Sequence, residues 1–415
     1  MKIAIVGAGA AGCFCAIHLK RMLPNATIDV FESGKKALAK VSITGGGRCN
    51  LTNSFKKVKS IQQVYPRGDK LMKRLLRQWS HTDTMQWFEN EGVRLVIQED
   101  ECVFPHSQDA MQIVNTLLHA MRRSGVQLHL SHRVAGIHPH EDGYSISFSD
   151  PKLYEFQCDA VVMATGGATS LTKLDLLQET MVKFATPVPS LFTFCIPDEK
   201  MHSLMGTVVE QTTVSIAGTR YKADGPLLIT HWGVSGPAIL KLSAYAARHL
   251  SEQAYKGTLC INWLGELDED AVRHLISSLQ HDYRNRNISH AYPNELTARH
   301  WEYLLKKCDI SPTAKWSELG GKKFNRLCAT LTSDTYPING QSKYKEEFVT
   351  CGGVALESIS MQTLESNNHP NLYFAGEVLD VDAVTGGFNL QAAWSMGYKV
   401  ATSITEKNKQ KECFS

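Results

Sequence analysis

Short apolar runs alternate with stretches of helical spacing at both ends of the chain. The apolar runs that have the length of buried strands lie at 3–6, 28–31, 159–164 and 371–374. Helical spacing follows the first run through Phe14, Ile17 and Leu19, and another helical stretch runs from about 385 to 400. This alternation predicts an α/β domain to which both ends of the chain contribute. Within it, 126–130, 132–137 and 144–148 predict the strands of a small hairpin layer, and Cys102–Pro105 predicts an irregular turn.

The middle of the chain has a different pattern, which begins near Pro187 and Pro189. Short alternating runs between 192 and 263, including 207–209 and 212–216, predict the strands of a β-barrel-like insert, with a helix at 238–250. Residues 267–327 carry periodic Leu, Trp and Tyr with many charges and no strand pattern, which predicts a small helical subdomain. The predicted parts are 1–187 with 345–415, 188–263 with 328–344, and 264–327.

A glycine turn follows the first apolar run, and an acidic residue ends the second. Gly7, Gly9 and Gly12 form GxGxxG between a predicted strand and a predicted helix, and Glu32 lies twenty residues after Gly12. Gly7 permits the tight turn, Gly9 lets backbone N–H groups approach a pyrophosphate, and Gly12 lets the helix pack closely. Glu32 is placed to accept hydrogen bonds from a ribose, so we predict a bound dinucleotide.

Residues 40–53 contain a second glycine loop. Three consecutive glycines at 45–47 are incompatible with stable helix or strand, and they leave bare N–H groups beside Arg48. Such a loop suits a second contact with a phosphate or a flavin ring, whereas the alternative is a flexible linker. The dense mixture of Gly, Arg, Cys and Asn favours the contact.

Composition and charge restrict the function only loosely. The chain has 415 residues, 43% of them hydrophobic, and a net charge of +3, which does not by itself indicate a nucleic-acid partner. Its eleven cysteines form no CxxC pair, so we expect reduced thiols, a cytoplasmic location and no metal site. No apolar run has the length of a membrane span, and the N-terminal run lacks the features of a signal peptide.

Basic residues are concentrated in one segment. Residues 56–77 contain eight Lys and Arg and a single acidic residue, Asp69, and Leu71, Leu75 and Leu76 have helical spacing there. A solvated helix surface is one interpretation, and a track for an anionic partner such as RNA is the other. A second basic group, with the same two interpretations, comprises Lys306, Lys307, Lys315, Lys322, Lys323 and Arg326.

Three long segments resemble a known family. They are KVSITGGGRCNLTN at 40–53, GVSGPAIL at 233–240 and LYFAGEVLDVDAVTGGFNLQAAWSMGY at 372–398. They are similar to the BaiN/RdsA-type (YhiN-like) NAD(P)/FAD-dependent oxidoreductases, and the resemblance covers essentially the whole chain. It implies a Rossmann-like FAD-binding domain interrupted by an insert of a β-barrel and a small helical subdomain.

The resemblance also implies where FAD binds. The matching residues are Gly7, Gly9, Ala11, Gly12, Glu32, Gly47, Arg48, Val134, Thr165, Gly166, Gly376, Glu377, Gly387 and Asn389. In such proteins the backbone at the position of Val134 meets adenine, and a helix N-terminus after Gly387 stabilises negative charge on the flavin. Ala383 departs from the family, which commonly has Gly there, and we expect this change to leave FAD binding intact.

The activities attributed to the family are reductions of carbon–carbon double bonds. One branch acts on uridine in large-subunit ribosomal RNA and another on unsaturated 3-oxo bile acids. In both, hydride from the reduced flavin adds to a carbon conjugated to a carbonyl, and an acid protonates its neighbour. Cys49 and His231 are the candidate proton donors. Alternatively, Cys49 packs against the flavin and His231 has a structural role.

We therefore expect an FAD-dependent reductase whose preferred substrate is uridine in large-subunit ribosomal RNA. The alternatives are a reductase of small enones and a non-catalytic flavin-containing module that binds RNA or a protein. Only one complete GxGxxG is present, so a separate nicotinamide domain is not expected. The electron donor is then NAD(P)H docking transiently over the flavin, or alternatively another donor. The sequence does not predict the oligomeric state.

Overall fold

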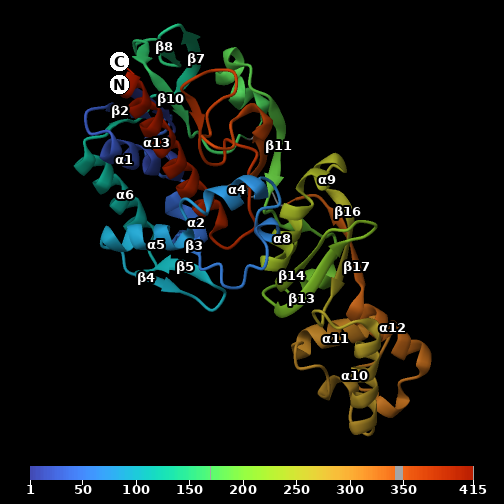
Figure 1. The fold of residues 1–415 in the computed structure, drawn as a ribbon. Helices are drawn as coiled ribbons and strands as arrows, with labels where there is room; N and C mark the ends of the chain where they lie inside the picture. The colour runs from blue at the N-terminus through green and yellow to red at the C-terminus, as the bar shows by residue number, and fades with distance from the viewer. Residues whose placement is uncertain (169, 342–348, 415) are drawn as a thin grey trace. The chain divides into compact units, whose positions relative to one another are not determined.

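The computed structural model describes residues 1–168, 170–341 and 349–414. The chain divides into two compact units (Figure 1). The first unit combines Met1–Val188 with Val349–Ser415, and the second is Pro189–Phe348. The finer division into three parts that the sequence suggests stays a prediction.

The first unit is built on a five-stranded parallel sheet. Its strands, in spatial order, are β19 (Leu372–Phe374), β10 (Ala160–Met163), β1 (Lys2–Val6), β2 (Thr27–Phe31) and β6 (Gln127–His129). The central strands are apolar on both faces because helices and loops cover both sides of the sheet, as is usual for parallel sheets. This order confirms the predicted α/β, Rossmann-like fold class.

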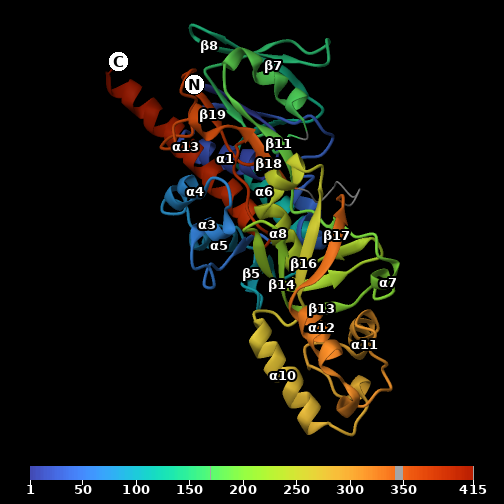
Figure 2. The ribbon, with the colours of Figure 1, turned by 90° about the vertical axis from the view of Figure 1, so that its right-hand side faces the viewer.

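Three long helices belong to the first unit: α1 (Ala10–Met22), α6 (Ala110–Ser124) and α13 (Phe388–Phe414). Helices α1 and α13 lie side by side in both views (Figure 1 and Figure 2). A Cβ added to Gly397 would lie 2.7 Å from the carbonyl oxygen of Ala11, so the two helices approach at backbone distance. This contact joins the end of the chain to its first helix.

Smaller elements complete the first unit. The hairpin layer expected from the sequence is β7 (Val134–His140), β8 (Gly143–Phe148) and β9 (Phe156–Cys158). A second small sheet contains β3 (Thr52–Asn53), β5 (Cys102–Pro105) and β4 (Leu95–Ile97). The remaining elements are α2 (Thr44–Gly47), α3 (Ile61–Val64), α4 (Asp69–Leu75), α5 (His81–Asn90), β11 (Phe184–Ser190), β18 (Val349–Val354) and 3-10 turns at Val41–Ile43, Leu171–Thr180 and Leu356–Ser358.

The sequence interpretation of Cys102–Pro105 as an irregular turn is wrong. The segment is the central strand of its small sheet, where Val103 pairs with Thr52 on one side and with Ile97 on the other. All four residues are buried. Pro105 lies at the end of the strand, where its missing N–H group leaves no hydrogen bond unmade inside the sheet.

The second unit contains a six-stranded antiparallel sheet. Its order is β12 (Phe194–Cys195), β15 (Gly233–Ser235), β14 (Lys222–Ile229), β13 (Val208–Ile216), β16 (Lys256–Asn262) and β17 (Asp334–Asn339). Phe194 bridges to Gln341, and the Cys195 N–H donates to the Gly340 carbonyl at 3.0 Å. These contacts join the two edges, so the sheet is a nearly closed barrel, as predicted.

Two local expectations for this barrel need correction. The predicted strands 207–209 and 212–216 form one strand, β13, because a bulge between Val209 and Thr212 absorbs the change in register. The predicted helix 238–250 is two helices, α8 (Pro237–Tyr245) and α9 (Ala247–Glu252), which meet at Ala246.

A helical module connects β16 to β17. It comprises α10 (Glu269–Asp282), α11 (Ala298–Lys307), α12 (Gly321–Thr332) and 3-10 turns at Ile288–His290 and Trp316–Glu318. Figure 2 shows the three helices at one end of the barrel strands. Trp263, Trp301 and Trp316 are fully buried in an apolar core that the helices share with the barrel. The short helix α7 (Glu199–His202) also belongs to this unit.

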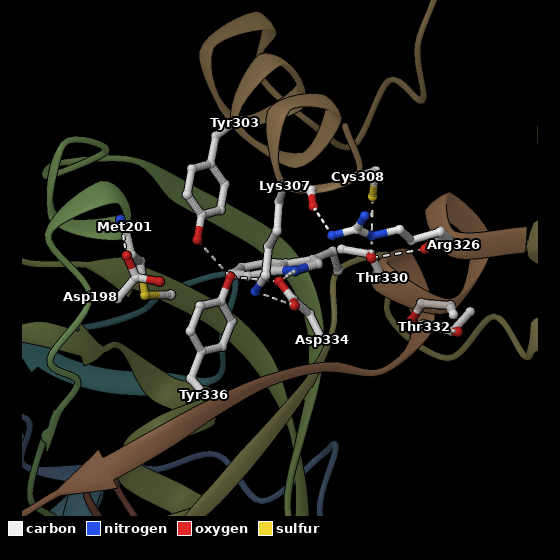
Figure 3. A network of polar contacts seen from close by, with 12 residues as sticks. Asp198, Met201, Tyr303, Lys307, Cys308, Arg326, Thr330, Thr332, Asp334 and Tyr336 are labelled. Carbon is white, nitrogen blue, oxygen red and sulfur yellow. Dashed lines mark hydrogen bonds and ion pairs between the residues drawn. The ribbon is translucent and has the colours of Figure 1, made fainter. Parts of the chain in front are cut away.

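A buried carboxylate ties the module to the barrel (Figure 3). Asp334 accepts hydrogen bonds from the Trp263 indole N–H at 3.0 Å, the Tyr336 hydroxyl at 2.5 Å and the Lys307 ammonium at 2.5 Å. The Tyr303 and Tyr336 hydroxyl oxygens are 3.0 Å apart. Hydrogen bonds from several donors offset the cost of removing the Asp334 carboxylate from water. Because Lys307 belongs to α11 and Asp334 to β17, the network holds α11 against β17.

Candidate functional site

The site begins where β1 ends, in a turn that only glycine can form. Gly7 has φ +108, and a Cβ there would lie 2.3 Å from the carbonyl oxygen of Ala164 at the end of β10. A Cβ at Gly12 would lie 2.0 Å from the carbonyl oxygen of Gly7. Both glycines therefore serve close packing of turn, helix and sheet, the roles that the sequence assigns to them.

Gly9 differs from these two glycines. It is the N-cap of α1, its backbone is extended, and a Cβ there would meet no atom within 4 Å. The first turn of α1 contains no acidic residue, and no side chain caps it. Its N–H groups and the positive end of the helix dipole therefore face open space, the arrangement that binds a pyrophosphate. The described residues thus fit the phosphates of FAD at this point.

Glu32 follows β2 at the same edge of the sheet. Its carboxylate accepts hydrogen bonds from the Ala8 N–H at 3.0 Å and the Gly34 N–H at 2.7 Å, and from the Ser33 hydroxyl at 3.1 Å. These bonds fix the carboxylate beside the glycine turn. Each carboxylate oxygen has two lone pairs, so ribose hydroxyls can still donate to it.

The carboxyl ends of β10 and β19 meet at this edge because their strands are parallel to β1. Thr165 and Gly166 follow β10, and Gly376 and Glu377 follow β19. The Glu377 carboxylate accepts the Thr350 N–H at 2.8 Å and lies 3.3 Å from the Lys40 ammonium. Ligands of open α/β sheets bind at the carboxyl ends of the strands, so these predicted residues lie in a suitable place.

The second glycine loop is a left-handed turn. Gly45, Gly46 and Gly47 have φ values of +58, +66 and +81, which side-chain-bearing residues adopt rarely and almost never in succession. The segment labelled α2 is therefore no ordinary α-helix. A Cβ at Gly46 or Gly47 would meet no atom within 4 Å, so this turn too borders open space.

The glycine loop interlocks with the start of α13. Asn53 Nδ2 donates to the Gly386 carbonyl at 3.1 Å, and the Thr52 hydroxyl donates to Gln391 Oε1 at 2.7 Å. The Asn50 amide bridges the Thr52 carbonyl and the Gly387 N–H, at 2.9 and 3.2 Å. The two segments that resemble the family most closely are thus neighbours in space, and the N-terminus of α13 is held beside the loop.

Asn389, predicted to bind FAD, has a visible structural role. Its side chain accepts the Ala383 N–H at 2.9 Å and donates to the Ala383 carbonyl at 3.0 Å. Ala383 is fully buried, so its methyl group is accommodated within the loop. The Asn389 backbone N–H lies in the first turn of α13, and its contact with a cofactor stays a prediction.

Arg48 is the exposed cation of the loop. Its guanidinium lies 4.6 Å from the centre of the Phe104 ring, and Nε donates to the Gly45 carbonyl at 3.2 Å. No carboxylate in the described part of the chain forms an ion pair with it. A guanidinium held in this way keeps donors for a phosphate.

Cys49 does not have the property that its predicted role as an acid needs. The side chain is fully buried at a backbone φ of +61, and burial raises the pKa of its thiol to about 12, although a hydrogen bond to Thr44 opposes the shift. A thiol whose pKa is raised so far is a weak proton donor near neutral pH. Arg48 is the neighbouring residue in the sequence, but the loss of solvation determines the pKa of the Cys49 thiol.

The remaining predicted residues are placed separately. Ala11 is buried on α1, where it packs against Gly376 and α13, and Val134 is partly exposed at the start of β7. His231 lies in the second unit, exposed, with its ring centre 4.2 Å from that of Trp232. Its role in proton transfer stays a prediction.

Sequence reasoning missed the residues that hold the loops together. Asn50, Asn53 and Gln391 join the two glycine segments, and Arg67 forms a double hydrogen-bonded ion pair with Asp382. The polar residues of NLTN and TGGFNLQ were a usable signal, because both segments mix amides with glycines. The pairing of Arg67 with Asp382 spans 315 positions and had no local signal.

The parallel sheet, the glycine turn with an open helix N-terminus and the carboxylate after the second strand form a Rossmann-like dinucleotide-binding domain, the class of fold that FAD-dependent oxidoreductases use. The chain belongs to the HI0933-like protein family, whose Rossmann-domain model matches residues 1–403. In the ranges that the structure describes, no group of His, Cys, Asp and Glu has the arrangement of a metal site. The helices of those ranges include none with the length and hydropathy to cross a membrane.

Two relatives of this chain carry the names of two different reductive activities. The chain is 27% identical over 416 residues to the ribosomal RNA dihydrouridine synthase of Escherichia coli K12, covering 96% of this chain and 97% of that protein. It is 25% identical over 421 residues to the 3-dehydro-bile acid delta(4,6)-reductase of Clostridium scindens, covering 98% and 99%. Among solved structures, quinol fumarate reductase of E. coli has a TM-score of 0.51 at 14% identity, covering 99% of this chain and 71% of that one, which shows a shared fold.

Proposed function

We propose that this protein reduces uridine in large-subunit ribosomal RNA to dihydrouridine, with FAD as cofactor and NAD(P)H as electron donor. The observation that carries the flavin chemistry is the open cradle at Gly9, where a side chain would meet no protein atom. The similarity to a ribosomal RNA dihydrouridine synthase supports the substrate. The concentration of basic residues at 56–77 also supports a polyanionic substrate over a small steroid.

Different residues of the chain would bind different parts of FAD. The first turn of α1 would bind the pyrophosphate, Glu32 the ribose, and Arg48 with the left-handed glycine turn a further anionic or polar part. The N-terminus of α13, fixed by Asn50 and Asn53, would stabilise negative charge on the flavin.

The reaction adds two electrons and two hydrogens to one double bond. FAD held by these residues would, once reduced, supply a hydride to C6 of uracil, whose C5=C6 bond is conjugated to the C4 carbonyl. C5 would take a proton from an acid or from water, and NAD(P)H is the proposed source of the two electrons. The burial of Cys49 argues against its thiol as that acid, which leaves His231 as the predicted donor.

A single-turnover experiment tests this proposal without depending on the donor. The FAD-loaded protein is reduced with dithionite without oxygen, mixed with unmodified large-subunit ribosomal RNA, and the RNA is analysed for dihydrouridine by mass spectrometry. We expect close to one dihydrouridine per flavin, and none with a Gly9→Glu variant that lacks FAD. Multiple turnovers with NADH or NADPH then identify the donor.

A parallel reaction with an unsaturated 3-oxo bile acid separates the alternatives. Reduction of the bile acid without reduction of RNA would contradict the proposed substrate and support a small-enone reductase. A flavin that transfers electrons to neither acceptor would contradict the enzymatic proposal and support a non-catalytic flavin-containing module.

A further inference from the structure

Positive charge on this protein is concentrated rather than spread. Of its 44 basic and 41 acidic residues, eight basic residues and one acidic residue lie at 56–77. The rest of the chain therefore has 36 basic and 40 acidic residues and is net acidic. A strongly basic segment in a chain that is otherwise slightly acidic attracts a polyanion to that segment.

The structure places four of these eight basic residues on one exposed helix face. Lys70, Lys73, Arg74 and Arg77 recur at helical spacing along α4 and the turn that continues it, and all four are exposed. The opposite face of α4 is buried through Leu71, Met72 and Leu75. At about 1.5 Å per residue the four cations span about 10 Å, roughly three phosphates of a nucleic-acid strand.

These cations are not used in ion pairs inside the protein. Within the described ranges no carboxylate pairs with the four cations of α4 or with Lys56 and Lys59 in the preceding loop. Lys57, by contrast, lies 3.7 Å from Glu101. Six unpaired cations on one segment repel one another in the free protein. Because no carboxylate of the described residues neutralises them, an anionic partner would reduce this electrostatic repulsion.

The cationic surface is anchored to the cofactor segment. Arg67, two residues before α4, makes a bidentate ion pair with Asp382, whose side chain is fully buried. A Cβ at Gly68 would lie 2.6 Å from a methyl carbon of Val381, so the backbone just before α4 packs closely against the loop that contains Val381 and Asp382. The loop leads directly to Gly386 and the start of α13, which places α4 beside the proposed flavin contact.

An aromatic stack contacts the start of α13, the helix that α4 also contacts. The Phe55 and His81 rings are stacked, with centres 4.9 Å apart and planes at 23°, and both residues are partly exposed. Phe55 also contacts the Phe388 ring edge-on at 5.2 Å. Phe55 has φ +59, an unfavourable conformation for a bulky residue, held by its N–H bond to Asn53 Oδ1 at 2.9 Å. Burial lowers the pKa of His81, which favours a neutral ring suited to stacking.

We propose that this surface, the α4 cations with the Phe55–His81 stack, binds a single-stranded segment of the RNA substrate. The cations contact successive phosphates, and Phe55 receives an unpaired base next to or at the uridine that is reduced. Proteins that recognise single-stranded RNA combine these two elements, because base stacking supplies contacts that phosphate binding does not. The inference rests on the proposed function for the identity of the RNA.

The helical module of the second unit offers a matched control. Lys322 and Lys323 are adjacent, exposed cations near the start of α12, like Lys73 and Arg74 on α4, and they belong to the second basic group. Lys307 and Arg326 of the same module are already paired, with Asp334 and Asp309. Reversing Lys322 and Lys323 therefore changes the net charge as much as reversing Lys73 and Arg74, at a different place.

The test measures binding of a fluorescent, uridine-containing single-stranded RNA to the FAD-loaded protein at several salt concentrations. We expect Lys73→Glu with Arg74→Glu to lower affinity at least about tenfold and to reduce the salt slope by about 1.4, the value for two lost phosphate contacts. Lys322→Glu with Lys323→Glu should change affinity by less than about twofold. Equal losses in the two double variants would overturn the assignment of this surface.

Phe55 is tested separately from the charges. Phe55→Leu should weaken binding about fivefold or more without changing the salt slope, and Phe55→Tyr should retain affinity. Flavin absorbance and melting temperature verify that each variant is folded. Wild-type affinity in Phe55→Leu would overturn the stacking role.

The single-turnover assay keeps the two proposals distinguishable. A wild-type protein that binds RNA through these residues but forms no dihydrouridine would contradict the proposed substrate and leave the binding surface standing. Unchanged dihydrouridine formation and affinity in the Lys73 and Arg74 double variant would overturn the surface and leave the proposed function standing.

Discussion

The ion pair between Arg67 and Asp382 offers a prediction whose size follows from burial. The Asp382 side chain is fully buried and that of Arg67 is 11% exposed. Burial alone would lower the pKa of Arg67, but its hydrogen bonds to Asp382 outweigh this and raise it. Arg67→Met keeps most of the side-chain volume and leaves the Asp382 carboxylate buried without its cation.

Removing one partner of a buried ion pair costs about 3–5 kcal/mol, because the remaining charge is neither solvated nor compensated. For a unit of roughly 250 residues, each kcal/mol lowers the melting temperature by about 2 °C. We therefore expect Arg67→Met to lower the melting temperature of the first unit by roughly 6–10 °C.

Calorimetry measures this effect, and added FAD identifies the transition of the first unit because a ligand stabilises the unit that binds it. The matched control in the same unit is Lys183→Met, which breaks the pair with Glu357, where the two side chains are 75% and 66% exposed. An exposed pair contributes less than about 1 kcal/mol, so its shift should be about 2 °C or less. Equal shifts for the two variants would refute the argument that burial sets the magnitude.

Three further predictions concern single residues. Gly9→Ala should fold with an unchanged melting temperature but lose FAD affinity, whereas Gly7→Ala should destabilise the apoprotein because its Cβ would lie 2.3 Å from the Ala164 carbonyl oxygen. Titration with FAD and thermal melting measure the two effects. Tight FAD binding by Gly9→Ala would contradict the assignment of the pyrophosphate to the open space at Gly9. Burial lowers the pKa of His300 to about 4, so between pH 6.5 and 4 the unfolded chain binds more protons than the folded chain and stability falls on acidification. Between pH 7 and 5 the free energy of unfolding should fall by about 2 kcal/mol because of His300. Denaturant titration at both pH values should show this loss in wild type and not in His300→Phe. An equal pH dependence in the two proteins would contradict the prediction. Cys49→Ala should keep the single-turnover rate within about threefold, because a thiol with a pKa of about 12 is a poor acid, and a hundredfold loss would restore the proton-donor role.

The sequence was informative wherever a local pattern decides the structure. Gly7 and Gly12 could be assigned packing roles from their spacing, because a strand, a tight turn and a helix leave little freedom in that order. The barrel could be predicted from short alternating runs. Cys102–Pro105 could not, because its strand depends on pairing with residues from 52–53 and 95–97 that lie far away in the sequence.

The candidate site was less predictable than the fold, for the same reason. Cys49 was a reasonable acid next to Arg48 in the sequence, but its pKa depends on burial, which only the packed structure reveals. The pairing of Asn50 with Gly387 joins positions more than three hundred residues apart. Long-range contacts of this kind decide which functional groups remain available to a ligand.

Mass spectrometry of large-subunit ribosomal RNA from source cells with and without this gene tests whether the protein forms dihydrouridine in that RNA. We expect that deletion removes the modification, that the intact gene restores it, and that a Gly9→Glu gene expressed at the same level does not. An unchanged dihydrouridine level in cells without the gene would contradict the proposed function.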